Sequence, residues 1–194
     1  MLDQAALDLL FNEARSHNDF AKTDLADDQL HALYDLMKMG PTSANCSPAR
    51  LVFVRSEAAK QRLAPLAMEA NQPKILNAAV CVIIANDTKF YDRIPELFPH
   101  QPAARDWFTG SEAFAAETAM RNGSLQAAYL MLAARGLGLD VGPMSGFDVE
   151  AVNREFFPDG RFKANMLCNI GTGKPEALFD RSPRLAFDDA CQIL

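Results

Sequence analysis

The segment "AAVCVIIA", residues 78–85, decides the fold of this 194-residue chain. It is a continuous apolar run with no polar alternation, which is typical of a strand that is buried on both faces of a sheet. Such a strand lies at the centre of a sheet and needs a layer of helices on each side. The rest of the chain is therefore expected to supply neighbouring strands and two covering layers.

The segments around this strand provide those elements. Further strands are expected at 51–54 ("LVFV") and 162–171 ("FKANMLCNIG"). Apolar residues at helical spacing, together with capping residues, predict helices over 3–14, 27–38, 57–70, 112–135 and 149–156. Pro65 is expected to kink or end the third of these helices early. The expected caps are Ser56, Ser111 and Asp148 at N-termini and Gly40 at a C-terminus. Several helices around a few short strands predict an α/β/α layering, but the pattern does not give the strand directions.

Residues 86–110 show no clear periodicity and are rich in proline and aromatic residues. A segment of that length without a regular pattern is typical of a functional lid. No linker or repeat divides the chain, so residues 1–194 are expected to form a single domain. The segment from about 172 to 194 is expected to pack either on its own domain or on a partner subunit.

Composition narrows the class of protein. A formal net charge of −6 argues against generic binding of nucleic acid or of anionic membranes. No apolar run approaches the roughly 20 residues that span a bilayer, and the N-terminal segment lacks a secretory pattern. The four cysteines are widely spaced, and Cys81 and Cys168 fall inside strand-like runs as expected buried thiols. The expected location is the cytoplasm.

Several common catalytic motifs are absent. No G-x-G-x-x-G follows a strand, and "GTGK" at 171–174 lacks the other residues of a phosphate-binding P-loop. Ser43 and Cys46 lie far in sequence from any histidine, so only folding could give them a catalytic base. The sequence shows no metal-ligand constellation, and none is expected.

Three polar or small-residue patches are the positive signals. "RSHN" at 15–18 offers groups that bind a phosphate, because arginine donates two hydrogen bonds in a fork. "MGPTSANCSP" at 39–48 and "GPMSGF" at 142–147 are loops of small residues, which allow a flat ligand to approach the backbone. Each patch taken alone is more typical of a turn than of a binding site.

Taken in order, these patches resemble the nitroreductase family of FMN-dependent oxidoreductases. The resemblance spans nearly the whole chain and rests on "R-x-H-N" at 15–18, "PTSANCSP" at 41–48, "NQPK" at 71–74, "LGLDVGPMSGFD" at 137–148 and "SPRL" at 182–185. It implies an α+β fold, a three-layer α/β/α sandwich with a central, mainly antiparallel sheet. Within the family, the loop is most similar to the subgroup of malonic semialdehyde reductases of uracil degradation, a pyrimidine degradation pathway.

The resemblance also implies roles for individual residues. Arg15 and Arg184 are expected to neutralise the FMN phosphate with help from Arg181, and Lys74 to lie near the pyrimidine edge of the flavin. Asp19 stands where many relatives carry a cation, and His17 where many carry serine. The full set of implied cofactor-binding residues is Arg15, His17, Asn18, Pro41, Thr42, Ser43, Asn45, Asn71, Lys74, Pro143, Met144, Ser145, Gly146, Arg181 and Arg184.

The implied reaction is a ping-pong relay in which NAD(P)H, as co-substrate, reduces FMN and leaves before the second substrate binds. The subgroup implies reduction of malonic semialdehyde to 3-hydroxypropionate, with Arg105 or Arg121 as candidate partners of the substrate carboxylate; no catalytic side chain is identified. A general nitro or quinone reductase and a non-catalytic flavin-binding protein are the alternatives. The family further implies a homodimer with flavins at the interface and the C-terminal arm over the partner.

Overall fold

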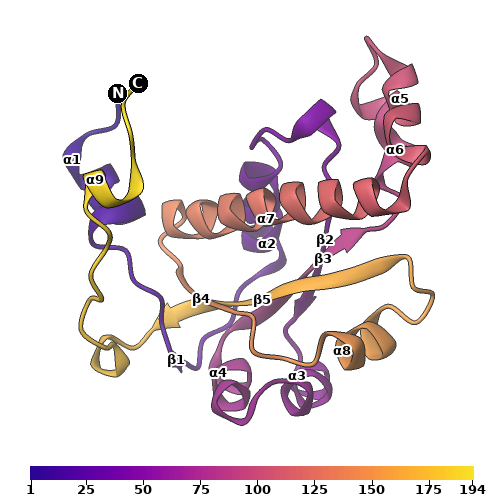
Figure 1. Cartoon of the computed structure of the whole chain (residues 1–194). Coiled ribbons are helices and arrows are strands. Elements are labelled where there is room, and N and C mark those ends of the chain that lie inside the picture. Colours follow the sequence, from indigo (N-terminus) through magenta and orange to yellow (C-terminus); the bar gives the residue numbers. More distant parts are fainter.

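The computed structural model describes all residues, 1–194, and its centre is a five-stranded sheet (Figure 1). Strand β5 has β3 along one side and β4 and β1 along the other, and β2 pairs with the far side of β3. Every pairing between these strands is antiparallel, as the family resemblance implied. The strands are β1 (Phe20–Ala21), β2 (Ala49–Val54), β3 (Val80–Asp87), β4 (Asp140–Met144) and β5 (Phe162–Gly173).

Helices cover both faces of the sheet, which confirms the three-layer prediction (Figure 1). One layer holds α2 (Asp27–Met37) and the long helix α7 (Glu112–Gly136). The opposite layer holds α3 (Glu57–Leu63), α4 (Gln72–Asn77) and α8 (Val149–Phe156). The predicted N-caps are confirmed, because the side chains of Ser56, Ser111 and Asp148 accept from backbone N–H groups three residues later.

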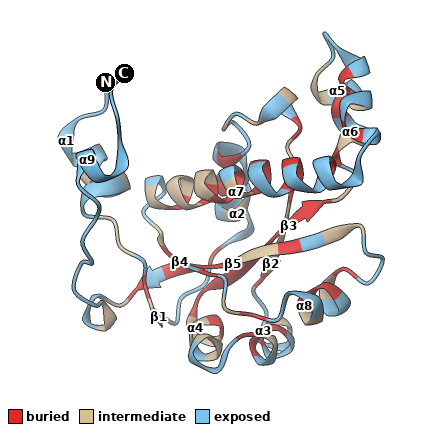
Figure 2. Ribbon diagram, in the orientation of Figure 1, coloured by how far each residue is buried: buried red, intermediate tan, exposed pale blue.

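Strand β3 is buried along its whole length, in agreement with the uninterrupted apolar run (Figure 2). Its side chains alternate between the layers: Val80, Val82 and Ile84 pack with α2 and α7. Cys81, Ile83 and Ala85 pack with α3, α4 and α8. Strand β3 therefore contributes to both cores, because successive side chains of a strand point to opposite faces of the sheet.

The three buried cysteines are free thiols, which confirms the expectation for Cys81 and Cys168. Burial raises the pKa of Cys168 to about 12 and that of Cys46 to about 11, and it raises the pKa of Cys81 further still. Thiols in such surroundings stay protonated and act as small apolar side chains.

Residues 88–111 form a folded excursion of short helices, although the sequence showed no clear periodicity there. Its short helices are η5 (Phe90–Arg93), α5 (Ile94–Leu97), η6 (Pro102–Arg105) and α6 (Asp106–Thr109). They enclose a small core of their own in which Phe90, Ile94 and Phe108 pack against the first turns of α7. Prolines lie in the first turns of α5 and η6. Because proline is favoured in the first turn of a helix and breaks a helix interior, each one begins a new short element instead of continuing the preceding one.

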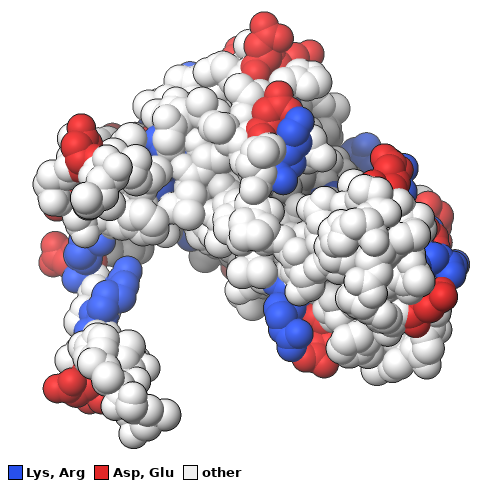
Figure 3. Space-filling view, turned by 90° about the horizontal axis from the view of Figure 1, so that it is seen from above, with Lys and Arg blue, Asp and Glu red and all other residues white.

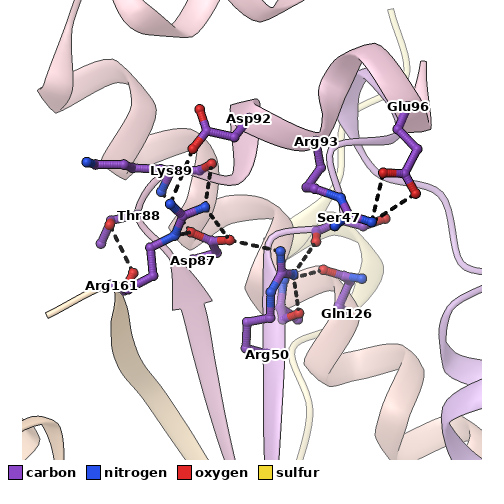
Figure 4. A network of polar contacts seen from close by, with 11 residues as sticks. Ser47, Arg50, Asp87, Thr88, Lys89, Asp92, Arg93, Glu96, Gln126 and Arg161 are labelled. Carbon is purple, nitrogen blue, oxygen red and sulfur yellow. Dashed lines mark hydrogen bonds and ion pairs between the residues drawn. The ribbon is translucent and has the colours of Figure 1, made fainter. Parts of the chain in front are cut away.

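A polar network anchors the excursion to the end of the sheet (Figure 4). The carboxylate of Asp87, the last residue of β3, accepts from Arg50 at 2.9 Å and from Arg161 at 2.5 and 3.1 Å. Arg161 also donates to Asp92 of η5 at 3.2 Å. Because Asp87 is only 2% exposed, these pairs satisfy a buried charge and join β2, β3 and the excursion.

Both ends of the chain lie outside the compact body. The first helix, α1 (Gln4–Leu7), continues as the π-helix η1 (Asp8–Asn12), and neither has a buried residue. The C-terminal segment carries η7 (Pro175–Ala177) and α9 (Phe187–Ala190), and it forms a lobe that stands apart from the body (Figure 3). Both ends expose large apolar side chains, namely Leu9, Phe11, Phe179, Leu185, Phe187 and Ile193.

Some local predictions were wrong. Gly40 does not cap α2, whose C-cap is Lys38; an added Cβ at Gly40 would lie 2.1 Å from the ring of Tyr129, so the position needs a small residue. Residues 140–144 form strand β4, although the glycine and proline there predicted a loop.

Helix α3 ends at Leu63, as the expectation of an early end at Pro65 allowed, and a 3-10 turn follows. No helix has the length and apolar character that a membrane crossing needs.

Candidate functional site

Four arginines surround one cavity of about 580 Å³ between η1 and the C-terminal segment. Three of them, Arg15, Arg181 and Arg184, are the predicted phosphate-binding residues, and the structure brings them together although they are far apart in sequence. The fourth is Arg135, near the end of α7, which the sequence did not single out. Asp180 is the acidic residue that also lines the cavity.

None of these arginines is paired with a carboxylate. Arg15 donates to the carbonyl of Phe179, and Arg181 donates to that of Ala14 at 3.2 Å, so the two segments hold each other. Arg184 also donates only to backbone carbonyls, those of Ser182 at 2.8 Å and Pro183 at 3.2 Å. Arg135 donates only to the carbonyl of Leu10, at 3.0 Å. Because a carbonyl bears no full charge, the cavity keeps an excess of positive charge that is suited to an anion.

A lysine lies beside this cavity. Lys74 of α4 donates from Nζ to Asn18 Oδ1 at 3.0 Å, and Asn18 lines the arginine cavity. The half-buried Lys74 makes no ion pair, so its charge is available to a ligand near Asn18. The structure thus brings two further predicted residues next to the arginines.

Asp19 is held in a clamp. Its carboxylate accepts from Lys174 Nζ at 2.7 Å and from Asn77 Nδ2 at 3.0 Å. The hydrogen bond from Lys174, followed by those from its neighbours, holds the pKa of Asp19 below its usual value. The carboxylate therefore fixes the segment after His17 to the residue that follows β5 and to α4.

His17 packs inside the protein, with 8% of its surface exposed. Its Nδ1 lies 3.6 Å from Asp140 and has no hydrogen-bond partner. A Cβ on Gly173 would lie 2.1 Å from the His17 ring, so the imidazole fills the space that this glycine leaves. His17 lines a second cavity of about 310 Å³ together with Arg15 and Arg135.

The loop after β4 is attached to the segment that precedes α4. Gly146 O accepts from Asn71 Nδ2 and from Met68 N, both at 3.0 Å. A Cβ at Gly146 would lie 2.8 Å from Asn71 Nδ2, so a larger residue there would displace the Asn71 side chain. Pro143 in β4 and Ser145 in the loop are exposed, and Met144, the last residue of β4, is buried.

The loop at 41–48 lies against α7, away from the arginine cavity (Figure 1). Two residues of α7 bind this loop: the Tyr129 hydroxyl donates to Pro41 O at 3.0 Å, and Asn122 Oδ1 accepts from Ser43 N at 2.8 Å. On the other side, Asn45 Nδ2 donates to Leu97 O at 2.8 Å. Thr42 Oγ1 accepts from Ser47 N at 3.1 Å. None of the cavities that the four arginines line includes this loop, so one chain alone does not unite the predicted residues.

The two candidate partners of a substrate carboxylate are surface residues. Arg105 lies 3.6 Å from Asp92 and 3.5 Å from Asp106, and it stacks over Tyr91. Arg121 pairs with Glu117 one turn earlier on α7. Within one chain neither lines the arginine cavity.

Residues 12–173 match the family model described as "Nitroreductase family". The chain belongs to the nitroreductase family. This nitroreductase chain is 55% identical over 190 residues to HadB of Ralstonia pickettii, named as a candidate NADH dehydrogenase/NAD(P)H nitroreductase, and the match covers 97% of each protein. The name of that relative does not mention malonic semialdehyde.

Solved structures share the fold of this nitroreductase over its full length. The candidate nitroreductase YdfN of Bacillus subtilis superposes with a TM-score of 0.88 at 25% identity and covers 99% of this chain and 100% of its own. A candidate nitroreductase of Exiguobacterium sibiricum, solved in complex with FMN, gives a TM-score of 0.89 at 20% identity, with 100% and 99% covered. The FMN in that complex agrees with the cofactor expected for the present family member.

The residues that the structure brings together fit FMN. Unpaired guanidinium groups around a cavity match a phosphate monoester, which accepts several charge-assisted hydrogen bonds. At Gly146 the absence of a Cβ lets the side chains of Asn71 and Met68 pack closely against the backbone. Arg135 escaped the sequence prediction because a basic residue in the last turn of a helix ordinarily serves the helix itself.

Proposed function

We propose that this nitroreductase-family chain binds FMN and catalyses the NAD(P)H-dependent reduction of a small organic substrate. The observation that carries the proposal is the cavity lined by Arg15, Arg135, Arg181 and Arg184, in which no guanidinium is neutralised by a carboxylate. Bound FMN supplies a carrier of two electrons and a hydride. The protein supplies position and charge.

Each group of residues has a distinct task in this proposal. The arginines hold the phosphate and thereby fix the position of the ring. Lys74, oriented by Asn18, places a positive charge beside the pyrimidine edge, where it stabilises the negative charge of the reduced ring. In this proposal the backbone at Gly146 lies beside the ring, where donor and acceptor bind in turn.

A second copy of the chain completes the site in this proposal. The loop at 41–48 lies away from the arginine cavity of its own chain. Since the family resemblance implies that both bind FMN, the proposal assigns the loop of one copy and the arginines of the other to one flavin. The apolar side chains of the N-terminal helix and the C-terminal lobe, such as Phe11 and Phe187, are exposed and suited to burial against a partner. Sedimentation should give a dimer at micromolar concentration, and a monomer at every concentration would refute this arrangement.

The proposed substrate is malonic semialdehyde, which would be reduced to 3-hydroxypropionate. The similarity of "GPTSANCSPAR" at 40–50 to the loop of the corresponding reductases supports this choice. A cation is then needed for the substrate carboxylate, and Arg105 and Arg121 are the proposed candidates. Replacing either with methionine should raise KM for malonic semialdehyde and leave KM for propanal unchanged; equal changes for both aldehydes would remove that candidate.

A second candidate function is the general reduction of nitro compounds or quinones. The name of HadB, a nitroreductase, favours it. Rates for nitrofurazone and menadione far above the rate for malonic semialdehyde would select this alternative.

The visible spectrum of the purified protein is the primary test. The holoprotein should be yellow, and anaerobic addition of NADH or NADPH should bleach the flavin bands. A colourless protein that binds no added FMN would refute the proposed function, whereas a yellow protein that neither nicotinamide reduces would indicate a flavin-binding protein without turnover.

A further inference from the structure

We propose that Arg135 is a phosphate-binding residue of the site and acts as a fourth cation beside Arg15, Arg181 and Arg184. The inference rests on the proposed binding of FMN and assigns a specific residue to the recognition of its phosphate. It is argued from the place of Arg135, from its hydrogen bonds and from the balance of charge around the cavity.

Arg135 forms part of a wall that separates two cavities. It lines the 580 Å³ cavity together with the other three arginines and the 310 Å³ cavity together with His17. Arg15 lines the same two cavities, so both arginines contribute to this wall. Two cations held side by side repel each other unless an anion lies between them.

The hydrogen bonds of Arg135 leave most of its donors unused. Nη1 donates to Leu10 O at 3.0 Å, and no other hydrogen bond of the side chain is formed. Nε is buried and has no partner. A half-buried guanidinium with so few acceptors is unfavourable by itself, and phosphate oxygens in the cavity would supply acceptors for its unused Nη donors. Burial also lowers the pKa of Arg135, as expected for a cation without a counter-ion, although the group stays charged at neutral pH.

The charge around the larger cavity favours a doubly charged anion. Four arginines face one acidic residue, Asp180, and none of the four lies within ion-pair distance of a carboxylate. In the smaller cavity Arg135 is accompanied by Asp8, Glu13 and Asp140, but it pairs with none of them. A phosphate monoester carries close to two negative charges at neutral pH and matches this excess.

A purely structural role is the alternative that the experiment has to separate. Arg135 lies in the last turn of α7, where a cation interacts favourably with the helix dipole, and its bond to Leu10 attaches η1. A structural role would affect the binding of every flavin equally. A phosphate contact affects only flavins that carry a phosphate.

The experiment compares FMN, riboflavin and inorganic phosphate as ligands of the apoprotein. Dissociation constants are measured for the wild type, Arg135→Met, Arg135→Lys and the control Arg93→Met, whose guanidinium pairs with Glu96 on the surface of the excursion. In Arg135→Met, FMN and phosphate should bind at least about tenfold more weakly, and riboflavin should bind as it does to the wild type. Arg135→Lys should recover part of the affinity, since lysine keeps the charge but not the fork. Arg93→Met should match the wild type.

The outcomes separate this inference from the proposed function. Equal weakening of FMN and riboflavin, or unchanged FMN binding, in Arg135→Met would overturn the role of Arg135 and leave the function intact. Binding of phosphate through Arg135 by a wild type that binds no FMN would support the role and refute the function. A wild type that binds neither ligand would overturn both. If Arg135→Met does not fold, the ratio of FMN to riboflavin affinity in Arg135→Lys decides the question.

Discussion

The ε-ammonium group of Lys74 donates to Asn18 Oδ1 at 3.0 Å and so joins α4 to the segment that follows η1. Lys74 was expected near the pyrimidine edge of a flavin and Asn18 among the cofactor-binding residues, and the bond gives the lysine a fixed direction. The side chain of Asn18 also lines the cavity of the four arginines. In the proposed function, one amide therefore links the phosphate cavity to the cation beside the ring.

Replacing Lys74 with methionine should make the reduction potential of bound FMN more negative by about 30 mV, which corresponds to about 1.4 kcal/mol for two electrons. The reason is that reduced flavin loses a neighbouring positive charge. Spectroelectrochemistry measures the shift. Lys89→Met, at the opposite end of the sheet, serves as the control and should leave the potential unchanged.

The pH dependence of stability should reveal the Asp19 clamp. The pKa of Asp19 is lowered in the folded state, chiefly by Lys174, so the clamp stabilises the protein above the unfolded pKa of about 4. This contribution is lost as the pH falls through the folded pKa. Urea unfolding should show Asp19→Asn less stable than the wild type at pH 7, with the difference shrinking below about pH 4. A difference that stayed constant at acidic pH would contradict the ionic role.

Replacing Asp87 with alanine should strongly destabilise the fold. The carboxylate is 2% exposed and holds both Arg50 and Arg161, so its loss leaves two partly buried cations without a partner (Figure 4). A loss of about 3–5 kcal/mol in the free energy of unfolding is expected. Asp92→Ala, which removes a half-exposed member of the same network, should cost less than about 1 kcal/mol. Similar losses for both variants would show that burial does not decide the effect.

The glycine after α2 should not tolerate alanine. A methyl group at Gly40 would overlap the Tyr129 ring and displace its hydroxyl from Pro41, so Gly40→Ala should lose about 1–3 kcal/mol of stability. Gly136→Ala is a matched control, because nothing lies within 4 Å of its added Cβ at the end of α7. It should be neutral or stabilising by up to about 1 kcal/mol in thermal or urea unfolding.

Much of the fold could be predicted from local patterns. The apolar run at 78–85 and the capping residues Ser111 and Asp148 depend on contacts within a few residues, so sequence alone predicted them. Strand β4 was missed because its glycine and proline are typical of a loop, and only pairing with β5 makes it a strand. Tertiary pairing overrides local preference there.

In the candidate site too, some residues could be predicted from the sequence and others only from the fold. Arg15 and Arg184 could be predicted from motifs, and the structure brings them to one cavity. Arg135 could not, because its significance depends on which segments pack against the end of α7. The place of the loop at 41–48, away from that cavity, also follows only from its contacts with Asn122 and Tyr129.

That loop does not keep its shape by itself. Ala44, Asn45 and Ser47 all adopt positive φ angles, at 48°, 48° and 38°, which are unfavourable for residues other than glycine. Its conformation is imposed by a helix more than seventy residues further along the chain. Anyone who transplants this loop into another scaffold will therefore have to carry the supporting helix surface with it, since the short segment alone does not encode its own geometry.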